Sequence, residues 1–293
     1  MKIFNLSESI CLDSEWVCEE PHRRQLRPIF LSSVSCEHRS ARARRNLLLS
    51  WIVLCMCTFS LASPCHISAS QVRFTSSHGQ VSVDLFTPVE SGPRPLIVMI
   101  HGSAGIFTIA PGIQSYEENF GEVRLAGDCF IVVLPHYMDV INVKSLTDLK
   151  ELQENFTLFL STLIELMPRF RSLPNVDSSR IGLYGESYGG FLAAALATSD
   201  STIAAVSEYS GGIPQGYRFV TKPPPFLIQH GQDDTLVPVS EAYGLKRAVE
   251  AAGGWASIVT FPANGHYFDK KSRAALLGNS VQFFEKQLDA RSP

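Results

Sequence analysis

Ser187 stands between two glycines, Gly185 and Gly189, at the spacing of a nucleophile elbow. An apolar run ends just before this group, and a run of small residues that favours a helix follows it. A backbone that lifts a serine hydroxyl clear of a sheet must turn sharply. The strand and the helix then pass too close for side chains two residues before and after the serine. The pattern therefore predicts a nucleophilic serine at a strand-to-helix corner, against the alternative of an ordinary turn serine.

A serine hydroxyl is a weak nucleophile until a base removes its proton, and that base needs a third group to hold it. Two later loops can supply both groups in the expected chain order, acid first and histidine second. One apolar run leads into loop 230–238, which contains Asp233 and Asp234, and the next leads into loop 262–268, which contains His266. We expect both loops at the carboxyl ends of parallel strands, where open α/β sheets bind their ligands.

The elements that would position these groups alternate along residues 70–290. Strands are expected over 72–74, 81–86, 96–100, 129–134, 181–184, 204–208, 226–229 and 257–261. Helices are expected over 115–125, 148–170, the stretch after the elbow, 240–252 and 272–288. Buried strands that alternate with helices predict a mostly parallel sheet with helices on both faces, and the first two strands predict an antiparallel hairpin.

Five ordered motifs then carry a resemblance. They are His101–Gly105 (HGSAG), Asp177–Gly182 (DSSRIG), Gly185–Gly190 (GESYGG), the His-Gly-x-x-Asp-x-x-Val-Pro run at 230–238, and Gly265–His266. Together they resemble the α/β-hydrolase superfamily, and within it the dienelactone-hydrolase-like branch. The resemblance implies the α/β-hydrolase fold over residues 70–290. The connection 210–225 is too short for a folded cap domain, so we expect an open site.

The resemblance also implies a role for each matching residue. Ser187 would attack the acyl carbon, and His266 would take the serine proton and pass it to the leaving alcohol. Asp234 would orient His266 and stabilise its charge. The oxyanion hole would consist of the backbone N–H groups of Ser103 and Tyr188. No metal and no cofactor is implied.

Dienelactone hydrolases proper are similar but carry a cysteine at the elbow, so the serine favours hydrolysis of ordinary carboxylic esters. The elbow also resembles that of prolyl-oligopeptidase-like enzymes, and a serine peptidase is the alternative among enzymes. A binding module that kept the fold and lost catalysis is the alternative from another class. The net charge of −3 gives no footprint for nucleic acid, which would need a clustered basic face. The resemblance implies a small-molecule ester as the partner.

Several nearby polar residues have competing interpretations. Asp234 matches the motif spacing better than Asp233, and Glu208 is a remote alternative acid, more typical of a pocket or the surface. We expect His101 and His230 to brace their loops by hydrogen bonds. Glu186 is expected in a structural ion pair or hydrogen bond, and His136 in the pocket or in a solvated loop.

The front of the chain differs from the rest. Residues 47–62 are uncharged, mostly apolar and preceded by arginines, but are short of the about 20 residues that a membrane span needs. They fit the apolar region of a secretory signal, with the paired Arg44 and Arg45 as a weak twin-arginine match. We therefore expect export to the periplasm or outside, with membrane contact only through this signal, and a cytoplasmic protein if the signal is unused. Residues 1–46 are expected to be a disordered leader or a mis-assigned start.

The cysteines are also divided between the front of the chain and the main domain. Five of the seven lie in or before the apolar region, which leaves Cys65 and Cys129 in the main domain. In an exported protein these two could pair, and an unpaired, buried Cys129 is an equally good interpretation. Neither cysteine has the spacing of a metal site.

Overall fold

The structure is a computed structural model, and it describes residues 65–106 and 122–289. The predicted leader, the predicted signal and the first part of the helix expected at 115–125 lie outside these ranges. Within them, no helix is both long enough and apolar enough to cross a membrane.

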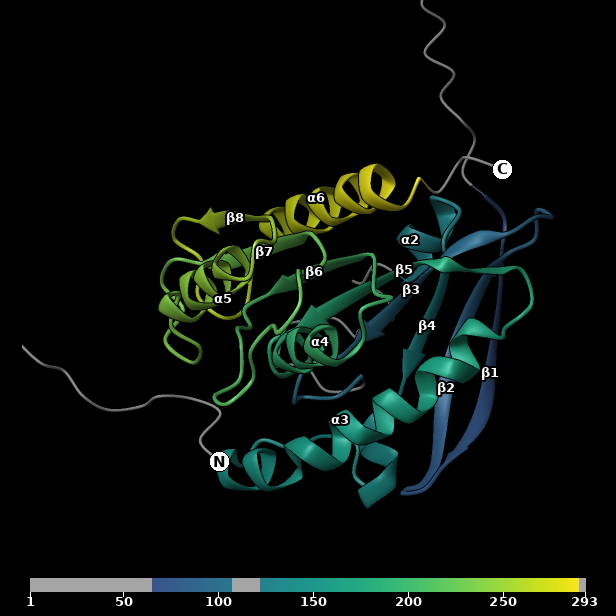
Figure 1. Ribbon diagram of the computed structural model, residues 1–293, viewed down its shortest axis with the longest axis horizontal. Coiled ribbons are helices and arrows are strands. Elements are labelled where there is room, and N and C mark those ends of the chain that lie inside the picture. The colour runs from purple at the N-terminus through teal and green to yellow at the C-terminus, as the bar shows by residue number, and fades with distance from the viewer. Residues whose placement is uncertain (1–64, 107–121, 290–293) are drawn as a thin grey trace, which may run out of the picture. The chain divides into compact units, whose positions relative to one another are not determined.

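An eight-stranded sheet forms the centre of the domain, in the order β1-β2-β4-β3-β5-β6-β7-β8 (Figure 1). The strands are β1 (Ile67–Ser76), β2 (Gly79–Pro88), β3 (Arg94–Ile100), β4 (Ile131–Pro135), β5 (Val176–Glu186), β6 (Ala205–Tyr209), β7 (Phe226–Gly231) and β8 (Ala256–Phe261). The pairs β1–β2 and β2–β4 are antiparallel, and all the other pairs are parallel. The mostly parallel sheet with an N-terminal hairpin is therefore confirmed.

Helices cover both faces of this sheet. They are α2 (Glu122–Gly127), the short 3-10 helix η1 (Tyr137–Ile141), α3 (Leu149–Arg171), α4 (Tyr188–Ser199), α5 (Ser240–Ala251) and α6 (Lys270–Leu288). Helices α3, α4 and α5 lie over one face, and α2 and α6 lie over the other (Figure 1). Each layer has its own apolar core, one centred on α3 and α4 and one on α6. Burial on both faces explains the continuous apolar runs of the central strands.

Helix α3 shows how local sequence produces these elements. Asp148 caps its first turn by accepting a hydrogen bond from the Glu151 N–H at 2.9 Å. The helical spacing places Leu149 on the same apolar face as seven other side chains, and Leu149 is half-buried. The other seven are buried, and Phe170 is buried with them: Leu152, Phe156, Phe159, Leu160, Leu163, Leu166 and Met167. The predicted bounds of 148–170 therefore differ from the observed ones by one residue at each end.

The start of β4 departs from the prediction of a strand from residue 129. Cys129 has φ of 72°, so the backbone is left-handed there and cannot be part of a strand. Its sulfur is bonded to Cys65, with the two Cα atoms 5.4 Å apart. The Cys65 N–H also donates to the Gly127 carbonyl at 2.8 Å. The pairing that the sequence left open is therefore present, and it holds the beginning of the domain to the turn between α2 and β4.

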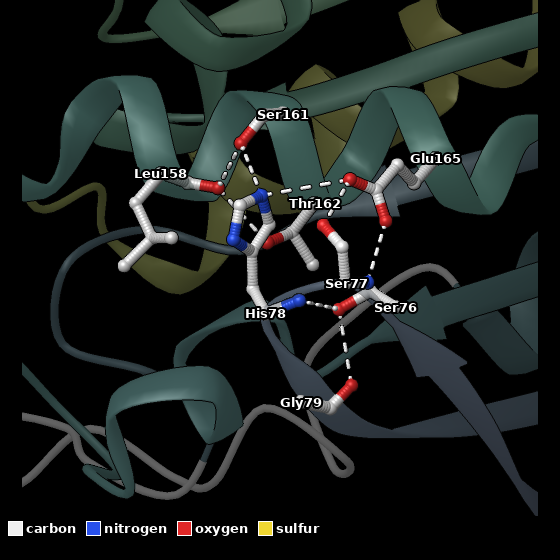
Figure 2. A network of polar contacts seen from close by, with 8 residues as sticks. All are labelled: Ser76, Ser77, His78, Gly79, Leu158, Ser161, Thr162 and Glu165. Atoms are coloured by element: carbon white, nitrogen blue, oxygen red, sulfur yellow. Dashed lines mark hydrogen bonds and ion pairs between the residues drawn. The ribbon is translucent and has the colours of Figure 1, made fainter.

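The turn of the N-terminal hairpin is fastened to α3 (Figure 2). The Ser77 N–H and hydroxyl both donate to the Glu165 carboxylate, at 2.7 and 2.6 Å. The His78 ring lies between Ser161 and Glu165, with Nε2 2.9 Å from the Ser161 hydroxyl and 3.5 Å from the carboxylate. These contacts join the antiparallel edge of the sheet to the helix that covers it.

Candidate active site

Ser187 occupies the corner between β5 and α4, as the glycine spacing predicts. The Ser187 backbone has φ of 51° and ψ of −116°, a conformation that costs energy for any residue with a side chain. Contacts with the surrounding structure must therefore hold Ser187 in this conformation. One such contact is the Ser187 N–H, which donates to the Tyr209 carbonyl of β6 at 2.8 Å. The strained turn is the geometry of a nucleophile elbow.

The two elbow glycines are required by close backbone packing. A Cβ on Gly189 would lie 2.0 Å from the Ile100 carbonyl oxygen, and one on Gly185 would lie 2.6 Å from the Gly189 carbonyl oxygen. Real Cβ atoms do not approach backbone so closely. The reason that the sequence suggested for both glycines is therefore confirmed.

The structure brings Ser187, His266 and Asp234 together from three strand ends. The Ser187 hydroxyl lies 2.8 Å from His266 Nε2, and His266 Nδ1 lies 2.8 Å from Asp234 Oδ2. An ionised carboxylate only accepts hydrogen bonds, so Nδ1 carries the ring proton and Nε2 is left to accept from the hydroxyl. This chain of contacts can withdraw a proton from Ser187.

Asp234 is buried and held on both oxygens. Oδ1 accepts from the N–H groups of Leu236 and Val237, each at 2.9 Å, while Oδ2 faces His266. Burial would raise the pKa of Asp234, but hydrogen bonds from His230 and His266 outweigh it and hold the pKa well below its usual value. Its neighbour Asp233 is exposed, so the choice between the two carboxylates agrees with the geometry.

The loop after β3 runs alongside the elbow. A Cβ on Gly102 would lie 3.5 Å from the Ser187 Cβ, so this residue, which precedes Ser103, packs beside the elbow. His101 is buried, and its Nδ1 lies 2.8 Å from its neighbour's carbonyl, Gly102 O, so it braces the loop as expected. Burial lowers the pKa of His101 to about 4, which keeps the ring neutral near pH 7.

Tyr137 is a supporting residue that sequence reasoning missed. Its ring stacks on His101 with centroids 4.2 Å apart, and its hydroxyl donates to the His101 carbonyl at 2.9 Å. It lies in η1, which follows Pro135 and has no periodic pattern of its own, so no sequence signal pointed to it.

Two interpretations of polar residues are wrong. Glu208 is neither a pocket nor a surface residue: its side chain is buried, and one oxygen accepts from the Gly211 N–H at 2.9 Å. His136 is buried against the hairpin, with Nε2 2.7 Å from Asp84 Oδ2, so its interpretation as a residue of a solvated loop is wrong. The partner of His136 lies on β2, which the local sequence around His136 does not identify.

Glu186 and His230 each make a structural hydrogen bond with another residue. A hydrogen bond from Tyr209 reaches Glu186, while burial raises the pKa of this carboxyl. His230 Nε2 lies 2.8 Å from the Val237 carbonyl and so braces its loop as predicted. No group of three or more His, Cys, Asp or Glu side chains within 65–106 and 122–289 could hold a metal ion.

Residues 81–287 match the dienelactone hydrolase family. The chain belongs to this family. The fold and the order of the motifs agree with the match, which makes the protein a hydrolase with the α/β-hydrolase fold.

Individual relatives are distant. A candidate carboxymethylenebutenolidase from Synechocystis sp. is 21% identical over 220 residues, which cover 71% of this chain and 89% of the relative. A dienelactone hydrolase-like promiscuous phosphotriesterase from metagenomic libraries superimposes with a TM-score of 0.63 at 16% identity, covering 75% of this chain and 98% of that one. An acylaminoacyl peptidase from Pyrococcus horikoshii gives a TM-score of 0.60 at 17% identity, covering 80% of this hydrolase but 43% of the peptidase. At these identities the structures share the fold.

Proposed function

We propose that this hydrolase is a serine esterase, which cleaves carboxylic esters through an acyl-enzyme formed on Ser187. The observation that carries the proposal is the unbroken set of contacts from the Ser187 hydroxyl through His266 to Asp234, at 2.8 Å each. A positioned base and a partly exposed hydroxyl on a strained turn are what acyl transfer from an ester needs.

In the proposed reaction, His266 Nε2 takes the proton as Ser187 Oγ attacks the acyl carbon. The imidazolium that forms is stabilised by Asp234 and then gives its proton to the leaving alcohol. Water attacks the acyl-enzyme by the same route, with His266 again as the base, and releases the acid. No proton needs to move onto Asp234, and its low pKa supports a carboxylate that stays ionised.

The negative oxygen of the tetrahedral intermediate needs fixed donors. We assign these to the backbone N–H groups of Tyr188, at the start of α4, and of Ser103, in the loop beside the elbow. A Cβ added to Gly102 would lie 3.5 Å from the Ser187 Cβ, and this packing of the loop beside the elbow supports the placement. Each such donor is typically worth about 3–4 kcal/mol in the transition state.

The proposal is tested with a fluorophosphonate probe and two substrate classes, p-nitrophenyl esters and aminoacyl-proline amides. We expect labelling at Ser187, ester turnover well above amide turnover, and a loss of at least about 10³-fold in kcat when Ser187 is replaced by alanine.

Other outcomes of the same experiment identify the alternatives. Amide turnover above ester turnover would make the protein a serine peptidase. Absence of labelling at Ser187, with turnover of neither substrate class, would favour a binding module on a hydrolase fold.

We also propose that the protein is exported. The bond between Cys65 and Cys129 supports this, because disulfides persist mainly in oxidising compartments. Intact-mass measurement on the native protein tests the proposal, and a mature chain that retains the first 45 residues would contradict it.

A further inference from the structure

His230 is a buried histidine that the proposed reaction does not use. It lies near the end of β7 with no exposed surface. The register pairs Glu208 of β6 with Ile228, and His230 is two residues further along, on the same face of the sheet as Glu208. It therefore stands beside a second buried carboxyl and just before the loop that carries Asp234.

The position of one proton on His230 follows from its partner. Nε2 lies 2.8 Å from the Val237 carbonyl oxygen, which can only accept, so Nε2 carries a proton whether the ring is neutral or charged. The same Nε2 lies 3.4 Å from Asp234 Oδ2, which is a longer contact. One N–H is thus shared between a carbonyl and the carboxylate, in a three-centre arrangement.

We propose that His230 is a positioning residue for the esterase reaction. Its Nε2–H is a second imidazole donor to Asp234 Oδ2, the oxygen that also accepts a hydrogen bond from His266 Nδ1–H. The inference rests on the proposed function, because the residue acts only through Asp234.

Two consequences follow from this contact. The extra donor limits rotation of a carboxylate whose other oxygen is already held by the Leu236 and Val237 N–H groups. It also withdraws part of the negative charge from Oδ2, which weakens the pull of Asp234 on a protonated His266. His266 therefore gives up its proton more readily in the presence of His230.

The groups around His230 keep this donor role independent of its own titration. Asp234, Glu208 of β6 and Glu241 of α5 all interact with the ring electrostatically. Burial lowers the pKa of His230, but the contact with Asp234 and the charge of Glu208 outweigh it and raise the pKa above its usual value. A second proton would enter at Nδ1, which has no hydrogen-bond partner among the described residues, and Nε2–H is present in either state.

The test compares four variants on a p-nitrophenyl ester. His230→Leu removes the donor, and His230→Gln returns a neutral one near the position of Nε2. Glu208→Gln keeps the neighbouring side chain neutral at every pH but leaves the donor in place. The matched control is His136→Gln, which makes the same replacement in another buried histidine–aspartate pair, with 2.7 Å between Nε2 and the Asp84 carboxylate, away from loop 230–238.

For His230→Leu we expect kcat to fall about 10-fold or more, as for other groups that orient a functional histidine or carboxylate. KM should stay within about threefold, and the acid limb of the kcat/KM profile should move up by about half a pH unit, because that limb reports the pKa of the free base. His230→Gln, Glu208→Gln and His136→Gln should stay within about threefold of the parent, with the limb unmoved.

An unmoved limb in His230→Leu would overturn the inference, as would an equal shift in Glu208→Gln. Proton NMR of the His266 Nδ1–H supplies a readout that needs no turnover, and its resonance should shift in His230→Leu and not in His136→Gln. If Ser187→Ala retained turnover, the esterase proposal would fail while the NMR comparison still tested the contact.

Discussion

At the scale of single residues, two buried carboxyls near the site differ in charge because they have different hydrogen-bond partners. Asp234 is stabilised as an anion by several donors, whereas Glu208 has one oxygen bonded to the Gly211 N–H and another without a partner among the described residues. Burial raises the pKa of Glu208 to about 7. The carboxyl ends of two neighbouring strands therefore hold one carboxyl that stays charged, Asp234, and one that is easily protonated, Glu208.

Glu208 should make stability depend on pH. Its pKa is about 7 in the folded protein against an ordinary value of 4.5, so between these values the folded protein holds a proton that the unfolded chain has released. The contribution of Glu208 to the free energy of unfolding therefore falls as the pH rises through this window, by up to roughly 3 kcal/mol. Glu208→Gln should be more stable than the parent at pH 8 and nearly equal to it at pH 4, as measured by urea unfolding. A difference that is equal at both pH values would contradict the assignment.

At the scale of elements, the elbow is a contact between three segments. Helix α4 begins against the end of β3, with Gly189 next to the carbonyls of Ile100 and His101. The loop that follows β3 then runs beside Ser187. The distance between the nucleophile and the proposed oxyanion donor at Ser103 is thus set by how closely α4 and β3 can approach.

Replacement of Gly189 by alanine should disturb this contact. The new Cβ would lie 2.0 Å from the Ile100 carbonyl oxygen, and backbone on both sides would have to move. We expect a loss of about 3 kcal/mol or more in the free energy of unfolding, and reduced kcat in the protein that remains folded. Gly278→Ala in α6 is the matched control, because nothing lies within 4 Å of its added Cβ. The control should be unchanged or more stable by up to about 1 kcal/mol, and an equal loss in both variants would refute the packing argument.

At the scale of the whole domain, one covalent bond closes a long loop. Cys65 and Cys129 are 64 residues apart, and the loop contains the hairpin, β3 and α2. The bond joins the beginning of the domain to the turn that precedes β4, remote in sequence from the elbow and both later loops. We therefore expect it to affect stability and to leave the chemistry unchanged.

Removal of this bond, by Cys65→Ser together with Cys129→Ser, should cost about 4 kcal/mol by loop entropy. That corresponds to a decrease in Tm of about 10 °C for a domain of this size. The kcat below the transition should be unchanged. A reductant should lower the Tm of the parent by a similar amount and leave the double variant unaffected. Equal Tm values for parent and variant would show that the bond is absent from the protein in solution.

The sequence by itself determined the order of strands and helices, the elbow and the three residues that meet at Ser187. Each of these has a local signature: buried strands are apolar throughout, α3 repeats with a helical period, and the elbow glycines mark a turn that permits no Cβ. The positions of Asp234 and His266 followed because both loops leave the same edge of a parallel sheet.

Only the tertiary structure decided which side chains meet across segments. The burial of Glu208, the pairing of His136 with Asp84 and the second imidazole beside Asp234 all depend on the register of neighbouring strands and on the packing of loops. Periodicity shows which face of an element is buried, but it does not name the partner on the next element. The sequence left the pairing of Cys65 with Cys129 undecided for the same reason. A disulfide requires two Cα atoms within about 7 Å, and only folding brings them that close.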